Sequence, residues 1–372
     1  KLSGISADRP EMLRAQEAIC ANGGIKKTRV FTKIFLAMFG QIPWEVCPAI
    51  PVEIILFGNW FPFNIYEMSS WSRGTVVPLS IVISHKPLHR LPEGRDVQEL
   101  FTNNEREFGC EPSGSIFSSW KNFFIYLDCI IKFVGKSPWK PFRKAALKKA
   151  FKWIVDHQED EGDFAGIQPA MLNSLLAYHY EGVSKEDPRW IKGWESVDRF
   201  LIEKREGTSM QACVSPLWDT AIAGNALCDS GLPADHPALI KAAEWILSKQ
   251  VVKKGDWIVK NPYAAPGGWA FEFFNELYPD CDDTAEILMF LNRIKLPDQN
   301  QKLKESERAM SWLLSMQCKG GGWAAFDLNN EMNLLNQVPF ADHGAMLDPP
   351  TVDVSGRVLW LLARTGFKKN HP

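Results

Sequence analysis

Three aspartates, Asp280, Asp282 and Asp283, lie within four consecutive residues of a chain that carries 15 Trp, 23 Phe and 6 Tyr. Carboxylates this close cannot all ionise at low cost once water is excluded, so at least one should keep its proton near neutral pH. A carboxylic acid that faces aromatic rings suits a reaction that starts with proton donation and continues through cations. These residues therefore indicate acid-initiated, cation-forming chemistry.

Composition excludes several other classes of function. A net charge of −2 over 372 residues argues against a nucleic-acid partner, which usually requires a basic patch. The eight cysteines are scattered and form no C-x-x-C pair, which predicts reduced thiols without a disulfide framework or a zinc site. The seven histidines show no spacing typical of metal ligands, and no uncharged apolar stretch is long enough to span a bilayer.

A repeated pattern indicates how the chain folds. In the segments 153–158, 245–250 and 312–317 a Trp precedes a Gln by five residues, and each Gln is followed by a Gly-containing turn and an aromatic residue. Apolar helices are predicted after these turns, near 218, 282 and 353, while strand-like alternation is sparse. Two helices per repeat, with long and unequal spacings, favour an all-α fold of closed α/α barrels over an open superhelix. Asp282 falls where the preceding repeat has Trp218.

We place a domain boundary near residue 212, which divides the chain into 1–212 and 213–372. The segment 116–134 is apolar on one face and carries Lys121 and Lys132. It is interpreted either as a core helix or as an interfacial helix that dips into a membrane without crossing it. Both ends of the chain look cut from a longer protein, so the first barrel is expected to be incomplete at its N-terminus and the second at its C-terminus.

Five motifs in a fixed order then carry a resemblance that runs over essentially the whole chain. The ordered set resembles the squalene–hopene cyclases. The motifs are S-P-L-W-D-T (215–220), G-G-W-A-F (267–271), Y-P-D-C-D-D-T-A-E (278–286), Q-C-K-G-G-G-W (317–323) and D-P-P-T-V-D-V (348–354).

The resemblance implies a two-domain class II terpene cyclase, with two α/α barrels around a large apolar cavity. It implies monotopic attachment to one membrane leaflet, on the cytoplasmic face of a bacterial inner membrane, and squalene as a membrane-dissolved substrate. It also admits a homodimer, and it implies neither a metal nor an organic cofactor.

The resemblance further implies roles for single residues. The middle aspartate of D-x-D-D, Asp282, corresponds to the general acid, and Asp280 and Asp283 correspond to residues that position and tune it. Aromatic faces stabilise cations by about 0.5–2 kcal/mol each without acting as nucleophiles. The residues that correspond to the substrate-binding set are Trp218, Phe271, Trp71, Phe326, Ile167 and Trp269.

This sequence departs from the family pattern at two site positions. Arg357 stands where a histidine often partners the acid, and Phe326 stands where tyrosine is often found. A permanently charged guanidinium stabilises the aspartate that remains after proton transfer. It also opposes the rise in proton occupancy that the clustered acids cause.

The predicted reaction is the proton-initiated cyclisation of squalene to pentacyclic triterpenes of the hopene and hopanol type. One alternative reads Asp282, Asp283 and Glu286 as a D-D-x-x-E element for Mg²⁺ and diphosphate. Oxidosqualene cyclases usually have Cys in place of Asp283, and diterpene cyclases share D-x-D-D without the Gln–Gly–Trp turns. An α/α-barrel glycoside hydrolase and a non-enzymatic helical-repeat scaffold are the remaining alternatives.

Overall fold

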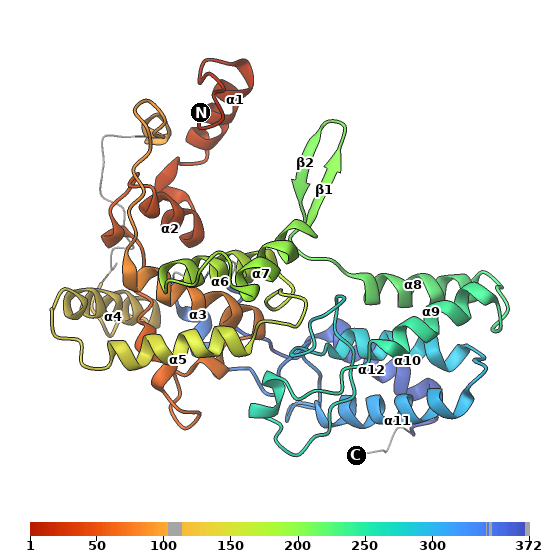
Figure 1. Cartoon of the computed structure of the whole chain (residues 1–372). Coiled ribbons are helices and arrows are strands. Elements are labelled where there is room, and N and C mark those ends of the chain that lie inside the picture. Colours follow the sequence, from red (N-terminus) through yellow and green to blue (C-terminus); the bar gives the residue numbers. More distant parts are fainter. Residues whose placement is uncertain (103–113, 340, 342–343, 369–372) are drawn as a thin grey trace.

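The structure, a computed structural model, describes residues 1–102, 114–339, 341 and 344–368. These residues form twelve α-helices and one β-hairpin joined by long loops (Figure 1), which confirms the predicted all-α class. The elements are α1 (Pro10–Ala21), α2 (Val30–Met38), α3 (Ser70–His85), α4 (Trp120–Gly135), α5 (Arg143–Asp156), α6 (Gln168–Tyr180), α7 (Pro188–Asp198), β1 (Leu201–Lys204), β2 (Gly207–Met210), α8 (Pro216–Asp229), α9 (Pro237–Ser248), α10 (Cys281–Arg293), α11 (Gln299–Ser315) and α12 (Val352–Arg364). The 3₁₀ turns are η1 (Ile25–Lys27), η2 (Trp44–Val46), η3 (Val52–Leu56), η4 (Ile65–Glu67), η5 (Gln98–Leu100), η6 (Asp256–Val259) and η7 (Asn333–Gln337).

The N-terminal group of helices is centred on α3, which packs along α6 and also contacts α5 (Figure 1). The hydroxyl of Ser69 accepts a hydrogen bond from the Ser72 N–H and so caps the start of α3. Gly74 faces α6, where an added Cβ would lie 3.5 Å from the Cβ of Ala170. These small residues let the two helix backbones approach closely. Val77 and Ile81 of α3 form one core with the buried apolar side chains of α5 and α6.

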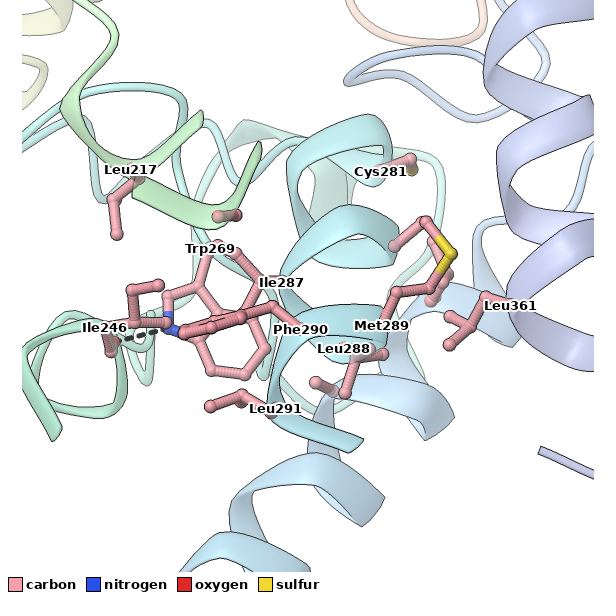
Figure 2. Packing of buried hydrophobic residues seen from close by; sticks show 14 of the residues in the cluster. Leu217, Ile246, Trp269, Cys281, Ile287, Leu288, Met289, Phe290, Leu291 and Leu361 are labelled. Carbon is pink, nitrogen blue, oxygen red and sulfur yellow. Dashed lines mark hydrogen bonds between the residues drawn. The ribbon is translucent and has the colours of Figure 1, made fainter. Parts of the chain in front are cut away.

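The C-terminal group surrounds α10, which contacts α8, α9, α11 and α12. Every residue of the segment 281–291 is buried except Asp282. Phe290 fills the space beside Gly224 of α8, where an added Cβ would collide with its ring. In Figure 2 Trp269 and Phe290 lie on one side of α10, while Met289 lies on the side toward Leu361 of α12. A helix buried on all sides thus carries one accessible carboxyl group at its start.

The glutamines of the repeated turns make equivalent hydrogen bonds. The side-chain amide of Gln158 donates to the carbonyl of Gly162, that of Gln250 to Gly267, and that of Gln317 to Gly321. Gln158 and Gln250 also donate to a carbonyl of a neighbouring helix region, at Arg189 and Glu305. Gln158 and Gln317 therefore each hold the glycine turn that follows them directly. Gln250 holds the G-G-W-A-F segment (267–271) instead of the nearer turn at Gly255 that the repeat predicted. Closure of the helices into barrels stays a prediction.

The helix α4 covers most of the predicted apolar segment 116–134 but begins only at Trp120. It buries Phe124 and Ile125 and leaves Phe133 77% exposed and Val134 60% exposed. It therefore packs through a mixed set of buried residues, which also includes Asn122 and Asp128, and leaves apolar side chains exposed near its C-terminal end. Within the described part of the chain, no helix combines the length and the apolar character that crossing a bilayer requires.

Seven of the eight cysteines lie among the described residues, and none of these seven forms a disulfide. Cys110 lies outside the described residues.

Candidate active site

Helices α8, α10 and α12 bring charged and aromatic side chains together within their first two turns. Nη1 of Arg357, on α12, lies 2.5 Å from Oδ2 of Asp282, and its Nε lies 3.2 Å from Oε2 of Glu286. The guanidinium carbon of Arg357 is 4.6 Å from the centroid of the Trp218 ring on α8. The structure therefore gathers three predicted site residues, Asp282, Arg357 and Trp218, around one guanidinium group.

Asp280 is the N-cap of α10. Its Oδ1 accepts hydrogen bonds from the N–H groups of Asp282 at 2.7 Å and Asp283 at 3.4 Å, which satisfies donors that the helix start leaves free. Burial, followed by the charge of Asp282, raises the pKa of Asp280 to about 8. Asp280 therefore fixes the backbone of the acid motif and tends to hold a proton at neutral pH.

Asp283 and Asp282 differ sharply in exposure. Asp283 is 1% exposed, and burial followed by the charge of Asp280 raises its pKa well above the usual range. The side chain of Asp282 is 21% exposed. Burial raises the pKa of Asp282, and Arg357 counteracts part of that rise. Asp282 is thus the carboxyl of this motif that is accessible and that has a cation ready to stabilise its ionised form.

Glu286 belongs to this group, although its sequence pattern assigned it a role only in the Mg²⁺ and diphosphate alternative. It lies one helical turn after Asp282 on α10 and is 8% exposed. One oxygen faces Arg357, and the other accepts a hydrogen bond from the side-chain amide of Asn225 at 2.9 Å. The i, i+4 spacing of 282 and 286 places both carboxyls on one helix face, and this signal could have predicted a shared partner.

The metal and diphosphate alternative assigns the same acids differently. In the structure Asp282 and Glu286 both point at the guanidinium of Arg357, and a fixed positive charge between two carboxylates repels a divalent cation. Among the described residues, no group of three or more His, Cys, Asp or Glu side chains has an arrangement that could hold a metal ion.

Two further predicted residues, Trp71 and Phe326, form a ring pair. Their centroids lie 6.0 Å apart at an interplanar angle of 72°. The Trp71 indole N–H donates to the carbonyl of Ala345 at 2.7 Å. Phe326 is linked to the acid motif through its neighbour Ala325, whose carbonyl accepts a hydrogen bond from the Cys281 N–H at 2.7 Å. The ring pair is therefore attached to the start of α10.

Trp269 differs from the other predicted substrate-binding residues, which are all partly exposed. It is fully buried, and its indole N–H donates to the carbonyl of Ile246 at 2.8 Å (Figure 2). A buried tryptophan needs such an acceptor for its N–H group. Trp269 therefore packs in the core beside α10 and presents no surface to a substrate in this structure.

Two family descriptions match almost the whole chain. The squalene-hopene cyclase N-terminal domain matches residues 1–206, and the squalene-hopene cyclase C-terminal domain matches residues 214–372. The chain belongs to the squalene–hopene cyclase family. This result confirms the resemblance that the ordered motifs predicted. The domain boundary near residue 212 stays a prediction.

The curated relatives of this chain include both squalene–hopene cyclases and a dammaradiene synthase. It is 41% identical to a squalene–hopene cyclase of Alicyclobacillus acidocaldarius over 99% of this chain and 58% of the relative. It is 40% identical to a dammaradiene synthase of Dryopteris crassirhizoma over 100% of this chain and 55% of the relative. It is also 40% identical to a squalene–hopene cyclase of Schizosaccharomyces japonicus, over 100% of this chain and 58% of the relative. The chain thus spans little more than half the length of these relatives.

A second cluster of buried acidic side chains lies beside the two remaining predicted site residues, Ile167 and Phe271. Gly166 precedes Ile167 and Glu272 follows Phe271, and an added Cβ on Gly166 would collide with Oε1 of Glu272. The backbone of Gly166 has a φ of 62°, a conformation that favours glycine. Glu272 therefore lies directly against the backbone that leads into Ile167.

The carboxyl groups of this second cluster, Glu159, Asp163 and Glu272, are all buried. Burial, followed by the charge of Asp163, raises the pKa of Glu159 to about 8. Burial raises the pKa of Asp163 to about 6 although Arg199 opposes it, and it raises that of Glu272 well above the usual range. These groups stabilise the fold most when they are protonated.

We expect replacement of Glu272 with Gln to protect the complete protein against alkaline pH. An acid whose pKa is raised by folding contributes stability that is full below its unfolded pKa and is lost as pH rises through its folded pKa. Wild-type stability should therefore fall as pH rises above the ordinary glutamate pKa of about 4.3. The variant should lose less stability, with a melting temperature on the order of 2–4 °C higher at pH 8. Calorimetry across this pH range measures the melting temperatures of the wild type and the variant. Glu244→Gln, an exposed change on α9, is the control, and parallel pH curves for all three proteins would contradict the expectation.

Proposed function

We propose that the complete protein cyclises squalene to pentacyclic triterpenes of the hopene and hopanol type, with Asp282 as the general acid. The observation that carries this proposal is the group of Asp282, Arg357 and Trp218 at the start of α10. A partly exposed carboxyl group lies between a guanidinium that stabilises its ionised form and buried acids that hold protons. A donor that must be both protonated and strongly acidic requires these opposing influences.

The chemistry follows from what these side chains can do. The carboxylic acid of Asp282 transfers its proton to one carbon of a terminal alkene, and the other alkene carbon becomes a cation. The resulting carboxylate stays paired with Arg357. Neighbouring double bonds then attack in turn, and the positive charge moves along the folded chain past aromatic faces. Loss of a proton or addition of water ends the sequence, so the first outcome is an isomerisation and the second a hydration.

The apolar cavity proposed for this reaction holds a flexible polyene in a reactive conformation, which removes much of the entropic cost of ring closure. Asp283 favours squalene over its epoxide, since an unactivated alkene is harder to protonate than an epoxide. A tetracyclic product is the second candidate, because a relative with 40% identity is a dammaradiene synthase.

The decisive experiment incubates the complete protein separately with squalene, oxidosqualene and geranylgeranyl diphosphate, with and without EDTA, and identifies products by mass spectrometry. We expect pentacyclic products from squalene, at a rate that the chelator leaves unchanged. Turnover of the diphosphate alone, and only when Mg²⁺ is present, would replace this proposal with the ionisation-type reaction. Tetracyclic hydrocarbons from squalene would favour the second candidate.

We also propose that α4 attaches the protein to one leaflet of the membrane, on the cytoplasmic face of a bacterial inner membrane. Phe133, Val134 and Ile130 form an exposed apolar surface on this helix. Lys132 lies on the same helix and pairs with Asp128. Apolar side chains at the acyl boundary with lysines near the head groups are typical of interfacial helices. A substrate dissolved in the same leaflet would then enter without crossing water.

Replacing Phe133 with Glu should weaken binding of the complete protein to anionic phospholipid vesicles. The change removes a large exposed apolar side chain and adds a charge that both acyl chains and anionic head groups reject. We expect a loss of about tenfold or more in the vesicle partition coefficient, measured by co-sedimentation. Ala145→Glu, an exposed site on α5, is the matched control. Equal binding of both variants would remove α4 from the membrane contact.

A further inference from the structure

Arg73 is a buried charge that the proposed reaction does not use. It lies in the first turn of α3 and is 1% exposed. Its Nη2 and Nη1 donate to Oδ1 and Oδ2 of Asp327 at 3.0 and 3.2 Å, and its Nε donates to Oδ2 of Asp256 at 3.0 Å. Nη1 also donates to the carbonyl of Met68 at 2.7 Å. One guanidinium from the N-terminal family domain thus holds two carboxylates of the C-terminal domain.

The partners of Arg73 are themselves held in place. Asp256 accepts hydrogen bonds from the Tyr278 hydroxyl at 3.0 Å and lies 2.7 Å from Nε2 of His157. Burial would raise the pKa of Asp256, but the charges of Arg73 and His157 lower it to about 2. Asp256 therefore stays ionised beside Arg73 at neutral pH.

Members of this network lie close to both rings of the Trp71–Phe326 pair along the chain. Trp71 is two residues from Arg73 along α3, and Phe326 is the neighbour of Asp327 in sequence. Oδ2 of Asp327 also accepts a hydrogen bond from the Ser70 N–H at 3.0 Å. The ion pair thus connects the two backbones from which the rings project, and each ring belongs to a different family domain.

A second carboxylate fixes the other side of the same loop. Oδ2 of Asp348 accepts hydrogen bonds from the N–H groups of Phe326 at 2.7 Å and Asp327 at 2.8 Å. The loop at Phe326 is therefore held by Asp348 on one side and by Arg73 on the other. Motion of Asp327 away from α3 would carry Phe326 with it.

We propose that Arg73 is a positioning residue for the cyclisation, because its bidentate hydrogen bonds to Asp327 hold the Trp71–Phe326 ring pair in position in the substrate cavity. This inference rests on the proposed function, which places the ring pair beside the cations. A planar guanidinium fixes both the distance and the orientation of a carboxylate, whereas a lysine ammonium acts as a single point of charge. Lysine at residue 73 therefore keeps the charge balance but loses the orientation.

The test compares Arg73→Lys with wild type in the complete enzyme. We expect kcat on squalene to fall about three- to thirtyfold, because a displaced ring loses part of its stabilisation of a cation. KM should change less than twofold, and incompletely cyclised products should increase. Arg143→Lys is the matched control, since Arg143 on α5 pairs with Glu53 away from the ring pair.

A readout without substrate separates positioning from general stability. 4-Fluorophenylalanine at residue 326 reports the Trp71 ring through its ¹⁹F chemical shift, and we expect Arg73→Lys to move this signal while Arg143→Lys does not. If Arg73→Lys fails to fold, Asp327→Asn, which keeps the shape of the carboxylate, takes its place. Unchanged kcat and product ratio, or a lower kcat with an unmoved ¹⁹F signal, would overturn the inference. A wild-type enzyme that does not cyclise squalene would instead defeat the proposed function, and the positioning role with it.

Discussion

Replacement of Asp282 with Asn is expected to abolish squalene cyclisation by the complete enzyme. Asparagine keeps the size of the side chain and can still accept a hydrogen bond from Arg357, but it has no acidic proton to give to an alkene. General acids contribute about 10²- to 10⁴-fold to typical rates, and a reaction that begins with protonation depends on its acid more than most. We therefore expect product formation to fall at least about a thousandfold, measured by gas chromatography of the squalene reaction.

The control for this change is Asp298→Asn. Asp298 is an exposed N-cap, and its carboxylate accepts a hydrogen bond from the Gln301 N–H at the start of α11. Asparagine caps helices about as well as aspartate does, so this variant should cyclise squalene at the wild-type rate. Wild-type product yields from Asp282→Asn would show that another group starts the reaction.

Replacement of Arg357 with Gln should lower turnover while leaving substrate binding almost intact. In the proposed reaction Arg357 stabilises the carboxylate that Asp282 becomes after proton transfer, and that charge is larger in the transition state than in the ground state. Loss of one such stabilising group costs on the order of a hundredfold in kcat in comparable sites. We expect this fall at saturating squalene, with KM within about twofold of wild type.

A pH profile distinguishes this role from a structural one. Arg357 lowers the pKa of Asp282, so its removal should leave Asp282 protonated to a higher pH. The alkaline limb of the activity profile should therefore move to higher pH in Arg357→Gln. Arg364→Gln is the matched control, because Arg364 lies on the same helix with its guanidinium 4.7 Å from the Trp360 ring centroid. An alkaline limb that stays in place would remove Arg357 from the support of the acid.

Local patterns explain which parts of this site could be predicted. The D-x-D-D motif predicts a helix start, and Asp280 is the N-cap of α10. The repeat places Asp282 and Trp218 at equivalent positions, and both contact Arg357 in the structure. The all-α class follows from the repeated pairs of helices. In each case the information lies within one turn of a helix or recurs along the chain.

Contacts between distant segments could not be predicted in this way. Arg73 and Asp327 are separated by 254 positions, and no periodicity connects residues this far apart. The partners of Glu286 and the burial of Glu272 against Gly166 depend equally on tertiary packing. Trp269 shows the reverse case. Its motif places it among cavity residues, but packing against α10 and the hydrogen bond to Ile246 put it in the core.

The contacts between α3 and the C-terminal family domain have a consequence for the construction of chimeric cyclases. The hydrogen bond from the Ser69 N–H to the Met346 carbonyl, at 2.8 Å, and the bond from Trp71 to Ala345 join α3 to the other family domain. Under the role proposed for the ring pair, product selectivity depends on residues of both family domains. A chimera that exchanged one intact domain would give Trp71 a foreign ring partner even if every residue within each half were kept. Gene libraries that shuffle these enzymes should inherit α3 and the segments 325–330 and 345–348 as one block.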